Sequence, residues 1–175
     1  MDRFVSTFTN KIDAKGRVSI PAPFRAVLER DGYSQGAAGT AAAGLGGIYC
    51  YPSIDAPALD GGGERLARKI DGLLRGLADY SDERDELSVA LYGDVRILNI
   101  DGDGRITLPD ALRNHAGLAG HVTFVGLGDK FQMWEPARFE ERRKVARDKV
   151  QQHRKLFARG GRSDTPSDDD GDDKR

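Results

Sequence analysis

The sequence has little cysteine and no long run of apolar residues. Cys50 is the one cysteine, so no internal disulfide can form, and its thiol lies in an apolar, aromatic segment where we expect it to be buried. No apolar run approaches the roughly 18 residues of a membrane span, and no basic start followed by an apolar stretch marks a secretory signal. We therefore expect a cytoplasmic protein without a membrane partner.

Histidine is scarce, and its spacing matches no zinc motif. The three histidines are not spaced from one another or from the cysteine as zinc ligands are; they are His115, His121 and His153. Residues 101–104, Asp-Gly-Asp-Gly, look like the start of a calcium loop, but such a loop needs an oxygen ligand at its fifth position and a Glu at its twelfth. Arg105 and Leu112 stand there. We expect no bound metal.

Motifs of catalysis and cofactor binding are also missing. Gly126 and Gly128 begin like a dinucleotide fingerprint, but Phe131 replaces the third glycine and no βαβ pattern surrounds them, so a turn between two strands fits better. No serine or cysteine has a histidine and an acidic partner nearby in the sequence, although triads are assembled in space. We expect no cofactor, no small-molecule substrate and no enzymatic activity.

A ten-residue segment that occurs twice organises the chain. Residues 12–21 read Ile-Asp-Ala-Lys-Gly-Arg-Val-Ser-Ile-Pro, and residues 100–109 read Ile-Asp-Gly-Asp-Gly-Arg-Ile-Thr-Leu-Pro. The same offset of 88 residues pairs Phe24 with Leu112 and Arg25 with Arg113. With 175 residues, 38% of them hydrophobic and 31% charged, the chain suits two half-size units that share one core.

Each copy is typical of a strand, a tight turn, a second strand and the start of a helix. Four residues are predicted to form the turns. Asp13 and Asp101 accept backbone hydrogen bonds, and Gly16 and Gly104 supply a positive φ. In the following strands the apolar side chains alternate with Arg17 and Arg105, which are predicted to lie on the opposite, outward face. A proline then ends each strand and a helical pattern begins.

Basic residues cluster around the first turn. Arg3, Lys11, Lys15 and Arg17 indicate either a solvated face or a surface that faces phosphates. Asp103 stands in the second copy where Lys15 stands in the first, so the two turns cannot be electrostatically equal. We expect the first turn to carry more of the attraction to phosphates.

The remaining segments predict further elements. Residues 1–9 alternate like a strand, and residues 24–32 suit a helix of about three turns. Residues 34–47, rich in Gly and Ala, are predicted to be a flexible inserted loop, after which residues 48–51 align with residues 131–134 at an offset of 83. Helices are predicted over 66–77 and 82–91, the second capped by Ser81 or Asp79. We interpret these helices as unique to the interval between the copies, where they either pack on the core or contact another subunit.

The last forty residues separate their charges. A helix is predicted from Pro136 to about Phe157, and residues 136–162 carry ten basic side chains against three acidic ones. Residues 163–175 carry six aspartates and are predicted to be disordered. The basic helix is either a solvated surface or an auxiliary DNA-binding surface that the acidic tail screens.

The repeated Asp-x-x-Gly-Arg turn with its following strand resembles the MraZ family of bacterial transcriptional regulators, whose fold is of the AbrB swapped-hairpin type. The likeness extends from Met1 to about Arg147 and includes residues 47–52, 93–94 and 125–135. It implies an α+β fold: a duplicated AbrB-like swapped-hairpin β-barrel of two pseudo-symmetric halves, with flanking helices and a C-terminal helix. The expected divisions are residues 1–53 (first half), 54–92 (intervening helices), 93–147 (second half and start of the C-terminal helix), 148–162 (end of the basic helix) and 163–175 (acidic tail).

The same resemblance implies a function. Members of that family act on repeated promoter boxes upstream of the division and cell-wall gene cluster that includes their own gene, usually as repressors. For this chain it implies double-stranded DNA as partner, a homo-oligomer in the form of a ring, and association with the nucleoid. Arg17 and Arg105 would contact bases, because arginine can donate two hydrogen bonds to guanine. The expected phosphate contacts are Lys15, Arg3 and Lys11. The alternative is an antitoxin-like interaction scaffold of the AbrB type with little specific DNA binding.

Overall fold

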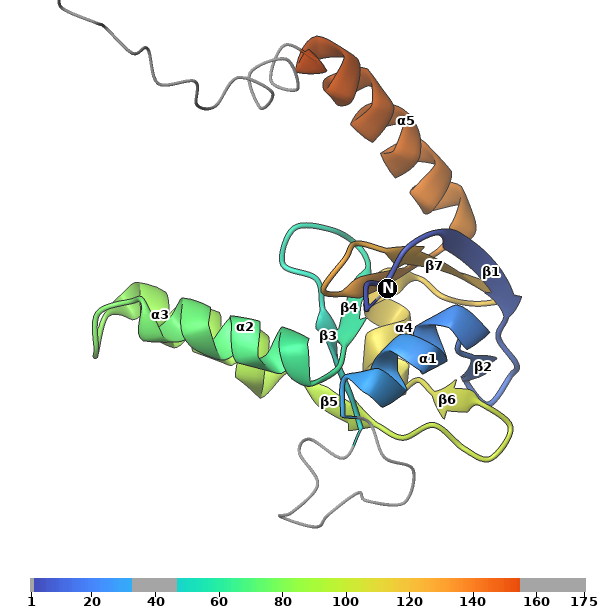
Figure 1. Cartoon of the computed structure of the whole chain (residues 1–175), viewed down its shortest axis with the longest axis horizontal. Helices are drawn as coiled ribbons and strands as arrows, with labels where there is room; N and C mark the ends of the chain where they lie inside the picture. The colour runs from blue at the N-terminus through green and yellow to red at the C-terminus, as the bar shows by residue number, and fades with distance from the viewer. Residues whose placement is uncertain (1, 33–46, 155–175) are drawn as a thin grey trace, which may run out of the picture. The chain divides into compact units, whose positions relative to one another are not determined.

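The computed structural model describes residues 2–32 and 47–154 and has a mixed α+β fold (Figure 1). The chain divides into two compact units, Met1–Phe139 and Glu140–Arg175. In chain order the elements are β1 (Thr7–Lys11), β2 (Arg17–Ser19), α1 (Ala22–Arg30), β3 (Ile48–Pro52), β4 (Leu59–Gly62), α2 (Glu64–Arg75), α3 (Asp82–Ser88), the π-helical turn η1 (Val89–Gly93), β5 (Arg96–Leu98), β6 (Arg105–Thr107), α4 (Asp110–Ala116), β7 (His121–Gly126), β8 (Phe131–Trp134) and α5 (Pro136–Gln152).

The strands form two antiparallel sheets. One has six strands in the order β1-β7-β8-β4-β3-β5, and the other is the two-stranded ribbon β2-β6. β1 of the first copy pairs with β7 of the second, and β5 of the second copy pairs with β3 of the first. In the ribbon, Val18 lies opposite its equivalent, Ile106. Strands of each copy are therefore hydrogen-bonded to strands of the other.

The pairing register corrects our alignment of the later segments. Leu98 pairs with Ile48, and its equivalent in the first copy, Asn10, pairs with Val122. β3 is therefore the equivalent of β7, and β4 of β8, so aligning residues 48–51 with residues 131–134 was wrong. α2 follows β4 as α5 follows β8. A helix after the fourth strand is thus common to both copies and not unique to the interval between them.

The first strand is shorter than its alternating pattern predicts. Ser6 has a φ of 77°, a left-handed conformation that interrupts extended backbone, and β1 begins only at Thr7. Phe4 forms a separate bridge to Gly128. The helix after Pro21 agrees with its prediction, since α1 ends at Arg30 and Gly32 follows with a φ of 87°.

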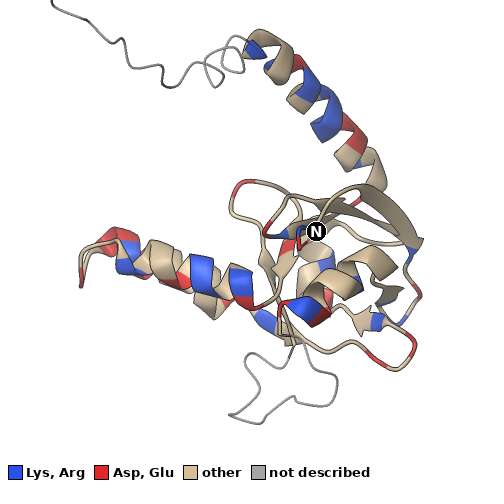
Figure 2. Ribbon diagram, in the orientation of Figure 1, with Lys and Arg blue, Asp and Glu red and all other residues tan. Residues whose placement is uncertain are grey.

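The two intervening helices form where their periodicity predicts them. α2 buries Leu66, Ile70 and Leu74, whereas Leu73 is exposed. Lysines and arginines lie along its solvent face (Figure 2). α3 begins after Ser81, whose hydroxyl oxygen accepts a hydrogen bond from the Arg84 backbone N–H at 3.2 Å, and it continues as the π-helical turn.

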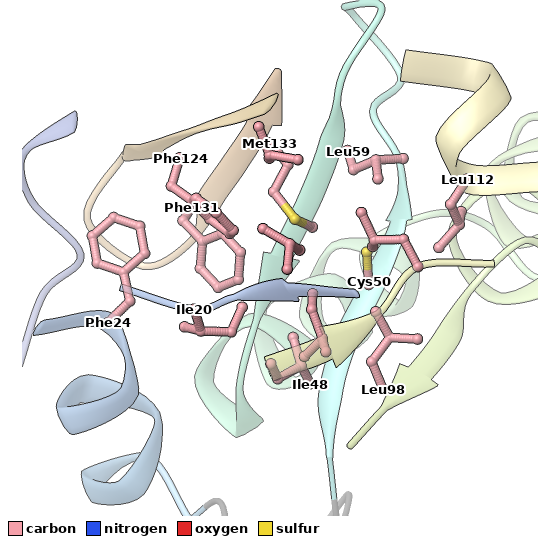
Figure 3. Close-up of a cluster of buried hydrophobic side chains, with 14 of the residues drawn as sticks. Ile20, Phe24, Ile48, Cys50, Leu59, Leu98, Leu112, Phe124, Phe131 and Met133 are labelled. Carbon is pink, nitrogen blue, oxygen red and sulfur yellow. The ribbon is translucent and has the colours of Figure 1, made fainter. Parts of the chain in front are cut away.

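The main core lies between the two sheets and the helices α1 and α4, and both copies contribute to it (Figure 3). Phe24 packs edge-on against Phe4 and Phe8, with ring centroids 5.3 and 5.5 Å apart, and Phe131 packs against Phe4 at 5.1 Å. Cys50 is fully buried here, as expected, and this burial raises the pKa of its thiol. A second cluster joins α2 to Tyr49, Tyr51 and Leu91.

α5 begins where sequence and side chains favour a helix start. Pro136 occupies its first position, and the Glu135 carboxylate accepts hydrogen bonds from the backbone N–H groups of Ala137 and Arg138 at 3.2 and 2.9 Å. Phe139 packs on Trp134 with ring centroids 6.1 Å apart. Within the described residues no helix is long and apolar enough to cross a bilayer. The predicted loop up to residue 46, the helix end after Arg154 and the acidic tail lie outside the described residues.

Candidate functional site

The first repeated turn is held by one aspartate. Asp13 Oδ1 accepts hydrogen bonds from the backbone N–H groups of Lys15 and Arg17, each at 2.9 Å. The Asp13 carbonyl oxygen accepts from the Gly16 N–H at 3.0 Å, and Gly16 has a φ of 81°. Arg17 Nε donates to Asp13 Oδ2 at 2.7 Å. One oxygen of the carboxylate thus closes the turn, and the other orients the arginine.

The second turn repeats this arrangement. Asp101 Oδ1 accepts from the backbone N–H groups of Asp103 and Arg105 at 2.9 and 3.0 Å, and Arg105 Nε donates to Asp101 Oδ2 at 3.1 Å. Gly104 has a φ of 79°. The Arg17 backbone N–H is the main cause that lowers the pKa of Asp13, and the Arg105 backbone N–H lowers that of Asp101 in the same way. Both carboxylates therefore stay ionised at neutral pH.

Each turn is also fixed by the other copy. The Gly16 carbonyl oxygen accepts from the Leu108 N–H at 2.8 Å, and the Gly104 carbonyl oxygen accepts from the Ile20 N–H at 3.0 Å. Arg25 lies against Gly104, where a Cβ would come within 2.4 Å of its Nη1, and Arg113 lies against Gly16. The sequence repeat pairs Arg25 with Arg113, but it did not reveal that each arginine packs against the turn of the other copy. The available signal was that both follow the repeated proline by four residues.

The ribbon β2-β6 presents the two turn arginines on one face. Val18 and Ile106 point into the core, each 1% exposed, so their neighbours along the strands point outward. Arg17 lies opposite Thr107, and Arg105 lies opposite Ser19. The two arginines are diagonal neighbours across the ribbon, and residues in this relation lie about 7–8 Å apart. Their side chains are partly exposed, 37% for Arg17 and 33% for Arg105.

The charges around the two arginines differ. Arg105 Nη2 donates to the Asp103 carboxylate at 3.0 Å, in addition to the bond from Nε to Asp101. In the first turn Lys15 takes the place of Asp103, and Asp13 is the one carboxylate among the described residues that pairs with Arg17. The first turn therefore has two cations and one anion, and the second has two anions and one cation.

The remaining basic residues of the predicted cluster separate in space. Lys11 ends β1, opposite His121, at the edge that leads into the first turn. Arg3 lies beyond the opposite end of β1, where its guanidinium pairs with Asp129, whose carboxylate also accepts from Lys69 Nζ at 3.2 Å. That hydrogen bond from Lys69 is the main cause that lowers the pKa of Asp129. The structure thus places Lys11, Lys15 and Arg17 at one end of the strand and Arg3 at the other.

The described part of the chain contains no group of three or more acidic, histidine or cysteine side chains that could hold a metal ion. A surface groove beside the second turn is lined by Arg25, Glu29, Asp101 and Asp103. Three of these four side chains are acidic, so the groove repels anions and adds to the difference between the two turns.

Comparisons with known proteins cover nearly the whole chain. A family model described as "MraZ protein, putative antitoxin-like" matches residues 92–156. The transcriptional regulator MraZ of Methylocella silvestris is 53% identical over 167 residues, which cover 95% of this chain and 94% of that protein. The protein of the same name from Xanthobacter autotrophicus is 48% identical over 166 residues, covering 95% of this chain and 97% of that protein. On this identity and coverage, the chain belongs to the MraZ family.

Proposed function

We propose that this chain is a sequence-specific DNA-binding transcriptional regulator, and that the ribbon β2-β6 with its two turns faces the DNA. One observation carries the proposal: two arginines, each oriented by the aspartate of its own turn, lie on one outward face of a two-stranded ribbon. The major groove of B-DNA admits a two-stranded ribbon. The names of the relatives, transcriptional regulators, support the same function.

The orientation of Arg17 suits recognition of guanine. Asp13 engages Nε, and among the described residues no acceptor engages the two Nη groups. Those two groups form the end of the guanidinium that donates a pair of hydrogen bonds to guanine O6 and N7. Arg17 is accordingly assigned a base contact. Arg105 has the same frame, but Asp103 competes for one of its Nη groups.

Lysines at the first turn are assigned to phosphates. Lys15 follows Asp13 within the turn, and Lys11 ends the strand that leads to it. Contacts of this kind position a protein on the duplex without reading sequence. Arg3 is assigned no more than a separate phosphate contact, because Asp129 offsets its charge at the other end of β1.

The wider proposal follows the family resemblance. The exchange of strands between the copies supports a swapped-hairpin barrel. Several chains would assemble into a ring and bind repeated promoter boxes upstream of a division and cell-wall gene cluster, including the chain's own gene, as a repressor. Joined sites would raise the effective concentration of each subunit at the next box, so that weak single contacts add up to tight binding.

The test is a titration of labelled DNA from upstream of the chain's own gene with the full-length protein. Arg17→Ala should weaken binding by about 5- to 150-fold, which corresponds to the 1–3 kcal/mol of one bidentate pair. Arg17→Lys keeps the charge but cannot form the pair, so it should restore little affinity for the promoter. Arg68→Ala, a 78% exposed arginine on α2, is the matched control and should bind like the wild type.

Two results would overturn the proposal. Wild-type protein that binds promoter DNA and a shuffled duplex equally has no sequence specificity. Unchanged binding in both Arg17→Ala and Arg105→Ala, with wild-type circular dichroism spectra, would favour the interaction scaffold instead.

A further inference from the structure

α5 and the two residues after it carry far more positive than negative charge. Between Pro136 and Arg154 seven basic side chains face three acidic ones, which are Glu140, Glu141 and Asp148. The basic ones are Arg138, Arg142, Arg143, Lys144, Arg147, Lys149 and Arg154. Lysine and arginine recur along the length of this helix in Figure 2. The surplus lies on an element that carries neither of the repeated turns.

The charges are arranged by helical geometry into rows. With 3.6 residues per turn, Arg138, Arg142 and Lys149 fall within an arc of about 40°, and a second arc of about 40° contains another three arginines: Arg143, Arg147 and Arg154. The strip between the rows is about 100° wide and carries Phe139, which packs on Trp134 at the start of the helix, followed by Ala146 and Val150. Glu141 and Asp148 fall on the opposite side of the helix. One half of the helix surface is thus basic, and the other half carries most of the acidic residues.

Ion pairs within the helix offset little of this charge. Arg143 pairs with Glu140 and Lys144 with Glu141, both at 3.6 Å between exposed or half-exposed groups. Pairs of this kind contribute little in water. No ion pair among the described residues involves Arg142, Arg147 or Lys149, and all three side chains are exposed.

Like charges also repel one another along this helix. Arg138 and Arg142 are four residues apart, as are Arg143 and Arg147, and like-charge pairs at this spacing destabilise a helix. A polyanion laid along the basic half would relieve that repulsion and release its own counterions. The 17 residues of α5 span about 25 Å, and a helix 10–12 Å wide fits the major groove, so the two rows would face the phosphates on either side.

We propose that α5 is a second DNA-binding surface, which grips the phosphate backbone through its two basic rows and does not read sequence. The proposal rests on the proposed function, because it takes duplex DNA as the partner, but it assigns a separate role to a separate element. The turns would select the site, and α5 would add attraction that is equal for every sequence.

The test compares two full-length triple variants with equal charge changes. One replaces Arg142, Arg147 and Lys149 by Gln, which keeps helix propensity. The control replaces Arg68, Arg75 and Arg96 by Gln, three exposed arginines that belong neither to α5 nor to either turn. Dissociation constants are measured on promoter DNA and on a shuffled duplex of equal length, from 50 to 200 mM KCl.

The α5 variant should lose at least about tenfold in affinity for both duplexes at 50 mM KCl. Its slope of log K against log[KCl] should be shallower by about 2–3, at roughly 0.9 per lost phosphate contact. The ratio of promoter to shuffled affinity should stay at the wild-type value. The control variant should keep the wild-type slope.

Failures of the two proposals give different results. A wild-type slope in the α5 variant, or an equal loss of slope in the control, would overturn the role of α5 and leave the ribbon untouched. If the wild-type protein binds both duplexes equally, the ribbon does not read sequence. A shallower slope of log K against log[KCl] in the α5 variant would then still support phosphate binding by α5.

Discussion

Asp103 stands where the first turn has Lys15, and its carboxylate accepts a hydrogen bond from Arg105 at 3.0 Å. A carboxylate at this position repels anions, and it engages an Nη group of Arg105, whereas no acceptor among the described residues engages the Nη groups of Arg17. One residue thereby makes two turns of nearly identical backbone chemically unequal. The difference in charge is visible in the sequence, but the contact with Arg105 is not.

Replacing Asp103 by Asn should strengthen promoter binding by about two- to fivefold at low salt, because one negative charge next to the DNA is removed. Fluorescence anisotropy at 50 mM KCl measures the change. Asp94→Asn, an exposed carboxylate outside both turns, is the control and should leave the affinity unchanged. Equal affinities of Asp103→Asn and the wild type would mean that the second turn does not approach DNA.

The roles of single residues could be predicted where they depend on local chemistry. Asp13 and Gly16 were expected to close a turn because a short acceptor and a positive φ are needed within four residues. Arg3, in contrast, was grouped with Lys11 and Lys15 by sequence distance alone. Ser6 interrupts the strand, and the guanidinium of Arg3 pairs with Asp129, 126 residues away, a contact that no local pattern encodes.

At the scale of elements, the repeated turn depends on its glycine. Gly16 has a φ of 81°, and a Cβ there would lie 2.8 Å from the Leu108 carbonyl oxygen. Gly102, in the second turn, has no atom within 4 Å of its Cβ position, and the first copy has Ala14 at the equivalent place. The backbone conformation therefore requires a glycine at position 16, whereas position 102 has room for a larger side chain.

Gly16→Ala should lower the free energy of unfolding by about 1–3 kcal/mol, from the left-handed conformation and the contact with backbone. Gly102→Ala should change it by less than about 0.5 kcal/mol. Urea unfolding followed by circular dichroism measures both. A smaller loss for Gly16→Ala than for Gly102→Ala would contradict the geometry of the first turn.

Whether a segment forms a helix or a strand could be predicted for most elements, but the pairing of the strands could not. The helices α1, α2 and α3 and the strands β2 and β6 follow from periodicity, caps and prolines. Local patterns could not predict which strands pair, since Thr7 pairs with Val125 across more than a hundred residues, and only the family resemblance implied an exchange of hairpins. The mistaken alignment has the same cause: residues 48–51 and 131–134 share an aromatic end, yet hydrogen bonding makes β7 the equivalent of β3.

At the scale of the whole molecule, opposite charges lie at the end of the chain. The basic helix precedes residues 163–175, which carry six aspartates and lie outside the described residues. In sequence terms the acidic segment is close enough to compete with DNA for the basic side chains, which would weaken binding to every duplex alike.

Deleting residues 163–175 should therefore tighten binding to a shuffled duplex by about threefold or more at 50 mM KCl, with a smaller gain at 200 mM because salt screens the competition. The control replaces the six aspartates of the segment by asparagines, which keeps its length and should give the same gain. Unchanged binding in both variants would exclude the segment as a screen.

The exchange of strands between the copies also bears on how such a chain could arise. A single copy would leave β1 without β7 and β3 with β4 as its one partner, so an ancestor with one copy would need a second molecule to complete its sheet. A pair of identical molecules must display two identical turns. Once both copies are joined in one gene, each turn can mutate alone, and the contrast between Lys15 and Asp103 is a change that only the fused form permits.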